Sequence, residues 1–203
     1  MLFRSLKDIS AFCPNFCKSK GIINKEVDPD YRKNPEPFKI KSSRKAVKKD
    51  ILLLDYVKDS IKFYELIKDK SIPEEVLYCI MKQVLLAIII AQKHKKFTHY
   101  DLHSDNILIK KCNKDDSILY VIDEENQFLV NTMGYYPVII DYGFGYIQDL
   151  EDRPLWASLA HTNVGFTSNK FDKYADAKLF LITVSGEIKE HRKTKNSKIL
   201  RRI

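Results

Sequence analysis

The 203-residue sequence predicts an α+β fold, a mainly helical body that carries a few short β-hairpins. Apolar residues recur at helical spacing over a long stretch, and this spacing predicts a helix over 73–95. Four short runs of strand-forming residues follow between 106 and 140, separated by turn residues. Apolar residues make up 44% of the chain, which suffices for a packed core and excludes wholesale disorder.

The first part of the chain predicts only short elements. Residues 2–12 have helical apolar spacing, and Pro14 ends that helix. Residues 16–23 fit a short strand. Residues 24–50 contain three prolines and many charges, so they are predicted to form an exposed Pro/Lys-rich insertion. The continuous apolar run over 51–57 predicts a buried strand.

The later elements follow from local patterns. A short helix is expected at about 61–68. Ser71, Pro73 and two following glutamates form a helix-start signature in which the Ser71 hydroxyl caps the long helix. Its continuous apolar run over 84–91 implies burial on most sides. A further helix is expected at about 174–184, and residues 187–203 are expected to form a frayed, basic tail.

The net charge of +8 is concentrated in two stretches. Residues 24–50 carry nine basic against five acidic side chains, and residues 187–203 carry seven against two. The rest of the chain is therefore close to neutral. Because such stretches are usually solvated segments, nucleic acid is not an expected partner.

Membrane, disulfide and zinc functions are not expected. The most apolar run has eight residues, whereas a spanning helix needs about 20, and charged residues interrupt the first apolar positions. The chain is therefore predicted to be intracellular, cytoplasmic or nuclear, with no membrane partner. Its four cysteines lack metal-ligand spacing and fit free thiols.

Three polar side chains stand beside predicted strands. They are Asp101 and Asn106 in THYDLHSDNILI and Asp141 in PVIIDYGFG. A carboxylate can accept a proton from an attacking hydroxyl group. An amide oxygen and a second carboxylate are hard ligands for a Mg²⁺ ion that bridges phosphate oxygens. The pattern therefore indicates a magnesium–nucleotide site.

HYDLHSDN resembles the protein-kinase catalytic loop, His-Arg-Asp-Leu followed by three residues and Asn, and DYG resembles the kinase Asp-Phe-Gly motif. The resemblance implies a Ser/Thr-type protein kinase that transfers the γ-phosphate of ATP to a protein substrate. It implies that Asp101 is the catalytic base and that Asn106 and Asp141 bind magnesium. His103 stands where many Ser/Thr kinases have a lysine beside the γ-phosphate. The combination of His103 with Tyr142 in place of Phe is similar to haspin-like and large-DNA-virus kinases, which suggests a virus-encoded protein.

The resemblance extends to the segment ILLLDYV, which is similar to the strand and hinge between the two lobes of a kinase. It implies that Leu54 is the gatekeeper, that the backbone of Asp55 and Val57 contacts adenine, and that Leu108 lies under the adenine ring. Asp176 stands where the family keeps a buried aspartate whose carboxylate accepts backbone hydrogen bonds from the catalytic loop.

The resemblance also divides the chain. Residues 1–57 correspond to a partial small lobe, with the end of helix C, strands 4 and 5 and the hinge, and they carry the insertion 24–50. Residues 58–186 correspond to the large lobe. Asp101 and Asp141 are 40 residues apart, roughly twice the family spacing, so residues 111–136 are expected to form an inserted hairpin.

Several family features are absent from these 203 residues. There is no Gly-rich loop, strand-3 lysine or partner glutamate, and Gly21 is the only glycine before residue 134. The chain is therefore expected to be N-terminally truncated and weakly active or inactive. Tyr100 replaces the arginine that usually senses a phosphorylated residue of the activation loop. This replacement argues against activation by phosphorylation of that loop.

Two other functions remain open. A pseudokinase or kinase fragment would act as a binding module. The presence of Asp101, Asn106 and Asp141 argues against a site that has lost its catalytic function. A small-molecule kinase of the aminoglycoside or choline type shares the Asp-to-Asn loop, but DYG directly after a strand favours a protein kinase.

Overall fold

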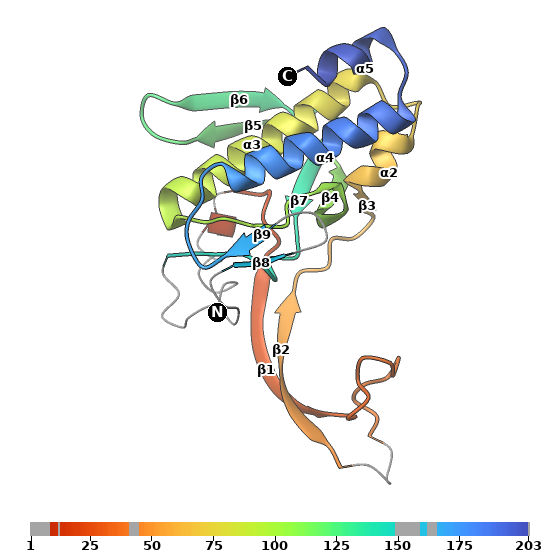
Figure 1. Cartoon of the computed structure of the whole chain (residues 1–203), viewed down its shortest axis with the longest axis vertical. Helices are drawn as coiled ribbons and strands as arrows, with labels where there is room; N and C mark the ends of the chain where they lie inside the picture. The colour runs from red at the N-terminus through yellow and green to blue at the C-terminus, as the bar shows by residue number, and fades with distance from the viewer. Residues whose placement is uncertain (1–8, 12, 41–44, 149–158, 162–165, 203) are drawn as a thin grey trace. The chain divides into compact units, whose positions relative to one another are not determined.

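The computed structural model describes residues 9–11, 13–40, 45–148, 159–161 and 166–202 (Figure 1). The predicted helix over 2–12 therefore lies mostly outside the described residues. The fold is mixed α+β with small antiparallel sheets, which confirms the predicted class at this level. The chain divides into two compact units, Lys18–Tyr56 and a larger one of Val57–Ile203 with Met1–Cys17. The described residues 9–11 and 13–17 thus cluster with the larger unit rather than with the strands that follow them.

The smaller unit is an antiparallel pair of strands, β1 (Ser19–Val27) and β2 (Val47–Leu54). Both strands extend into the predicted insertion, which is therefore shorter than 24–50. Cross-strand polar pairs stabilise this part of the ladder: Glu26 lies opposite Lys48, and Asn24 Nδ2 donates to Asp50 Oδ1 at 2.9 Å.

The prediction of a buried strand over 51–57 is wrong for the end of β2. Leu53 and Leu54 are each 40% exposed. A two-stranded sheet buries little apolar surface by itself, which accounts for this exposure.

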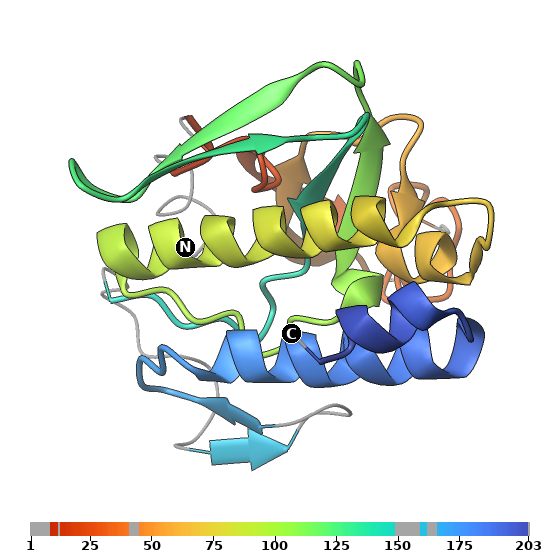
Figure 2. The ribbon, with the colours of Figure 1, turned by 90° about the horizontal axis from the view of Figure 1, so that it is seen from above.

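The larger unit is built around helix α3 (Glu74–Lys95), close to the predicted 73–95. Its buried side chains recur at helical spacing and form the centre of the core. The helix ends at Lys96, whose backbone is left-handed (φ 46°) and whose amide donates to the Gln92 carbonyl oxygen at 3.0 Å. In Figure 2 the chain segment between α3 and β4 lies between α3 and α4 (Ala175–His191).

Helix α3 begins differently from the prediction. Pro73 occupies the N-cap position, and no side chain caps the helix. The amide and hydroxyl groups of Ser71 instead donate to Asp69 Oδ1, at 2.9 and 2.7 Å. This local turn closes helix α2 (Phe63–Lys68) before α3 begins.

Three small sheets complete the larger unit. Strands β3 (Ile61–Lys62), β4 (Ile107–Lys111) and β7 (Tyr135–Ile139) form one antiparallel sheet. Strands β5 (Ser117–Val121) and β6 (Gln127–Asn131) form a hairpin within residues 111–136, with Tyr120 and Val130 in the core. Strands β8 (Leu159–His161) and β9 (Phe166–Ser168) form the third sheet.

The predicted frayed tail is wrong. Helix α4 continues to His191, and a further helix, α5 (Lys195–Leu200), follows it. Arg192 is 5% exposed and fixes this segment, since its guanidinium group donates to backbone carbonyl oxygens in and after α2: those of Leu66, Ile67, Asp69 and Ile72. These contacts join positions more than a hundred residues apart, so no local pattern predicts them.

Within the described residues, no helix combines the length and apolar character needed to cross a membrane. All four cysteines are free thiols, as predicted: Cys13, Cys17, Cys79 and Cys112.

Candidate functional site

The loop between α3 and β4 holds Asp101 and is anchored at its start by backbone pairing. The amide and carbonyl groups of Thr98 exchange hydrogen bonds with those of Tyr146, at 2.9 and 2.7 Å. His99 is fully buried, and its Nε2 lies 3.0 Å from the Ile140 carbonyl oxygen. The loop is thus attached to the segment that contains Asp141.

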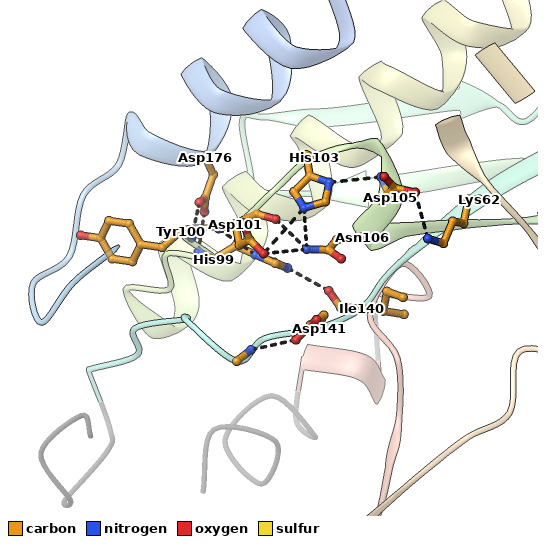
Figure 3. A network of polar contacts seen from close by, with 11 residues as sticks. Lys62, His99, Tyr100, Asp101, His103, Asp105, Asn106, Ile140, Asp141 and Asp176 are labelled. Carbon is orange, nitrogen blue, oxygen red and sulfur yellow. Dashed lines mark hydrogen bonds and ion pairs between the residues drawn. The ribbon is translucent and has the colours of Figure 1, made fainter. Parts of the chain in front are cut away.

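The carboxylate of Asp176 fixes the backbone of this loop from α4. The amide of His99 donates to Oδ2 at 2.8 Å, and the amide of Tyr100 donates to Oδ1 at 2.9 Å (Figure 3). The expected hydrogen bonds from the loop amides to a buried aspartate are therefore present. Asp176 is 0% exposed, and burial raises the pKa of its carboxyl group to about 7, although both amide donors act to lower it.

Asp101 and Asn106 form a hydrogen-bonded pair. Asn106 Nδ2 donates to Asp101 Oδ2 at 3.0 Å and to the Asp101 carbonyl oxygen at 2.9 Å. This geometry turns the amide oxygen of Asn106 away from the Asp101 carboxylate, as Figure 3 shows. The short 3₁₀ turn Ser104–Asn106 brings the two side chains together across the loop.

His103 completes the cluster. Its Nδ1 accepts a hydrogen bond from the amide of Asp105 at 3.3 Å. Its Nε2 lies 3.7 Å from Asp101 Oδ2 and 3.2 Å from Asn106 Nδ2. The imidazole therefore lies on the same side as the Asp101 carboxylate.

Asp141 and Asn106 lie next to each other because of strand pairing. Ile107 pairs with Ile139 across β4 and β7, and the Ile140 amide donates to the Asn106 carbonyl oxygen at 3.0 Å. Asp141 thus comes one residue after Ile140, the residue that pairs with Asn106. Its side chain is exposed, and its Oδ1 accepts from the Gly143 amide at 3.3 Å.

His99 lies within electrostatic reach of both aspartates of the cluster. Burial lowers the pKa of His99, while its hydrogen bond to Ile140 and the charges of Asp101 and Asp141 act in the opposite direction. The imidazole is therefore held neutral, as a structural link between the two acidic segments.

Tyr142 fixes the chain directly after Asp141. Its ring is 2% exposed and packs edge-on against those of Phe97 and His99. Its hydroxyl donates to the Ile139 carbonyl oxygen at 2.5 Å and accepts from the Cys17 amide at 3.0 Å. Burial raises the pKa of Tyr142 well above its usual value, so this phenol stays protonated.

Two residues of the site have strained backbone. Tyr100 (φ 62°) and Asp141 (φ 58°) adopt left-handed conformations that are uncommon for residues other than glycine. Each costs on the order of 1–3 kcal/mol and persists only where surrounding contacts hold it. Asp176 supplies such a contact at Tyr100, and the flanking β7 and Tyr142 supply them at Asp141.

The residues predicted to contact a nucleotide base lie in different units. Leu108, on β4, and Val57 belong to the larger unit, and Asp55 belongs to the smaller one. Within its own unit the Asp55 amide donates to the Lys18 carbonyl oxygen at 2.8 Å, and its carboxylate pairs with Lys20 at 2.9 Å.

The described residues contain no group of three or more histidine, cysteine, aspartate or glutamate side chains placed to hold a metal ion. Asn106 and Asp141 nonetheless each carry an oxygen atom of the kind that Mg²⁺ prefers as a ligand. Magnesium is usually bound by one or two carboxylates, with waters and substrate phosphates completing its coordination.

Two contacts that support the loop do not follow from the sequence motifs. Ser104 Oγ donates to Glu187 Oε1 on α4 at 2.7 Å, and Lys62 on β3 pairs with Asp105 at 2.9 Å. Burial raises the pKa of Glu187, and its Oε2 is buried without a hydrogen-bond partner among the described residues. Glu187 lies 83 positions from Ser104, so only the fold reveals it.

No family model matches the chain. The chain is 33% identical over 216 residues to uncharacterized protein 098R of Invertebrate iridescent virus 6, covering 89% of the chain and 36% of that protein. It is 34% identical over 140 residues to uncharacterized protein 038R of Invertebrate iridescent virus 3, covering 68% of the chain and 26% of that protein. The chain therefore spans only about a third and a quarter of the length of these relatives. The expected similarity to viral proteins is confirmed.

Proposed function

We propose that the chain carries a protein-kinase-type phosphotransferase site that uses Mg-ATP, with Asp101 as the catalytic base. The observation that carries the proposal is the cluster itself. The Asp101 carboxylate is hydrogen-bonded to Asn106, Asp141 lies at the adjacent strand end, and Asp176 holds the loop backbone.

Each side chain has a chemical role in this proposal. Asp101 accepts the proton of a Ser or Thr hydroxyl group, and His103 Nε2 lies 3.7 Å from its Oδ2. Asn106 and Asp141 bind magnesium, which neutralises the charge that develops on the phosphate oxygens. In the same proposal Leu108 and the backbone of Val57, which both belong to the larger unit, contact the adenine.

The rate of transfer is expected to be low. Phosphoryl transfer depends mainly on positioning and electrostatic stabilisation, and these 203 residues contain no Gly-rich loop to cover the phosphates. Since the viral relatives are much longer, the activity, substrates and partners of a whole relative are also matters of proposal.

The test is to incubate the full chain with Mg²⁺, γ-labelled ATP and a generic protein substrate. We expect slow transfer to Ser or Thr that Asp101→Asn abolishes, because the amide cannot accept the proton. Asp115→Asn, in the exposed turn before β5, is the matched control and should leave the rate unchanged. Transfer at the same rate in wild type and Asp101→Asn would contradict the assignment of the base.

A second candidate is nucleotide binding without transfer, as in a pseudokinase. It is favoured by the pairing of Lys62: this ammonium group contacts the loop but is 2.9 Å from Asp105 Oδ1, so Asp105 competes with phosphate oxygens for it. Magnesium-dependent ATP binding together with no transfer above the Asp101→Asn background would support this candidate.

A further inference from the structure

An open cavity of about 830 Å³ lies beside the N-terminal half of α4. Phe171, Ala175, Leu179 and Ile182 contribute its apolar lining, and Tyr100 borders it from the loop that holds Asp101. A volume of this size is in the range of ligand and peptide sites. The cavity belongs entirely to the larger unit.

Helix α4 has one buried face and one face that lines the cavity. Asp176, Phe180, Val184 and Ile188 form the buried face. Residues 175, 178, 179 and 182 recur at i, i+3, i+4 and i+7 and line the cavity; Lys178 is basic, and the other three form an apolar stripe. Ile182 is 71% exposed at the end of this stripe. A large aliphatic side chain so exposed in a hollowed surface is a feature of interaction sites.

The cavity is bordered by positive charge. Lys170, Lys173 and Lys178 contribute to its lining, and none of them forms an ion pair with a described residue. The Nζ atoms of Lys173 and Lys178 lie 4.7 and 5.5 Å from the centre of the Tyr174 ring. These cation–π contacts hold the ammonium groups in place without neutralising them.

One carboxylate lines the cavity, but backbone groups already engage it. Asp172 Oδ1 accepts hydrogen bonds from the amides of Tyr174 and Ala175, at 2.8 and 3.1 Å, at the start of α4. The Lys96 ammonium group adds a further positive charge 5.6 Å from the centre of the Phe171 ring. An occupant with negative charge would therefore complement this surface.

We propose that this cavity is a docking groove for an acidic, amphipathic segment of a partner protein. The apolar stripe of α4 takes the aliphatic side chains of the segment, as in helix-in-groove recognition, and the lysines pair with its carboxylates. A second copy of the groove would bring like charges together, so self-association through this face is disfavoured.

The groove adjoins the loop of Asp101 through one residue. The Tyr100 hydroxyl donates to the Lys170 carbonyl oxygen at 2.6 Å, and its ring points away from the Asp101–Asn106 cluster in Figure 3. That the docked protein is also the phosphate acceptor rests on the proposed function. That an acidic segment binds in the groove does not rest on it, so a binding measurement tests the groove independently of phosphate transfer.

The test is the binding of fluorescein-labelled peptides to the full chain, followed by anisotropy. The probe has leucines at i, i+3, i+4 and i+7 with glutamates between them, and a second peptide has lysine in place of every glutamate. We expect the acidic peptide to bind about tenfold more tightly or better, and its affinity to fall as salt is raised. Ile182→Ser and the double variant Lys173→Glu, Lys178→Glu should each weaken binding about tenfold.

Matched controls keep the test specific. Leu129→Ser on β6 removes an equally exposed aliphatic side chain, and Lys198→Glu on α5 reverses an exposed charge outside the groove. Neither should change the affinity, and thermal unfolding checks that every variant folds. Equal binding of the two peptides, or groove variants that bind like wild type, would overturn the proposal. Self-association lost on Ile182→Ser would overturn it too, since it would assign the groove to a second copy.

Discussion

At the scale of single residues, the Asp176 carboxyl group holds the loop that presents Asp101. Both of its oxygens accept amide hydrogen bonds from the loop, and one of these amides belongs to Tyr100, whose backbone is left-handed. Removing the carboxyl group would leave buried donors unsatisfied, at a cost of about 1–3 kcal/mol. The same contacts would therefore stabilise the fold and position Asp101.

The raised pKa of Asp176 makes stability depend on pH. With a pKa of about 7 in the folded protein against about 3.9 when unfolded, the folded state binds the additional proton between these values. The free energy of unfolding of the wild type should therefore fall, relative to Asp176→Asn, as pH rises from about 4 to about 7. Denaturant unfolding at a series of pH values measures this difference. Parallel curves for the two proteins would contradict it, and Asp115→Asn should follow the wild type.

The sequence motifs place most of the candidate site. Asp101, Asn106 and Asp141 come together because strands β4 and β7 pair next to them, and short strands at these positions follow from local residue patterns. Glu187 and Lys62 could not be predicted, since their contacts with Ser104 and Asp105 depend on how α4 and β3 pack.

At the scale of elements, Arg192 joins the end of α4 to the end of α2. Its guanidinium group satisfies carbonyl oxygens that a helix end leaves without intrahelical partners. Thr194 then caps α5, since its Oγ1 accepts from the Ser197 amide at 2.9 Å and donates to Glu74 Oε1 at 2.7 Å. The segment from 192 to 200 is therefore an ordered part of the larger unit.

Arg192→Ala should lower the free energy of unfolding by about 3 kcal/mol or more, because several buried carbonyl oxygens lose their donor. Lys193→Ala is the neighbouring control: this side chain is exposed, and its loss should cost less than about 0.5 kcal/mol. Urea unfolding of both variants makes the comparison. Equal, small effects would show that the segment is dispensable.

Elements with strong local signals were the predictable ones. Helix α3 has an apolar stripe along its whole length, and the β5–β6 hairpin has turn residues between two strand-forming runs. The continuation of α4 and the presence of α5 were not predictable, because Gly186 and a run of charges weaken the local helical pattern. Contacts with α2 and α3 override that weakness.

At the scale of the whole molecule, much of the net charge of +8 lies on ordered structure. Residues 187–203 carry seven basic side chains, and they belong largely to the end of α4 and to α5 rather than to a free tail. The lysines of the groove lie in the part of the sequence that is otherwise close to neutral. The proposed docking groove is therefore a local feature of α4 and the segment before it.

We propose that Asn106 and Asp141 hold a magnesium–nucleotide beside Asp101, and thermal unfolding of the full chain with ATP, with and without Mg²⁺, tests this binding. A ligand at about 100 times its Kd adds about 2.7 kcal/mol, which raises the Tm of a chain of this size by several degrees. We predict such a rise with Mg-ATP, a smaller one with ATP and EDTA, and loss of the magnesium-dependent part in Asp141→Asn. Asp141 is exposed, so this variant should fold normally. No magnesium-dependent rise in the wild type, or the same rise in Asp141→Asn, would contradict magnesium–nucleotide binding by Asn106 and Asp141.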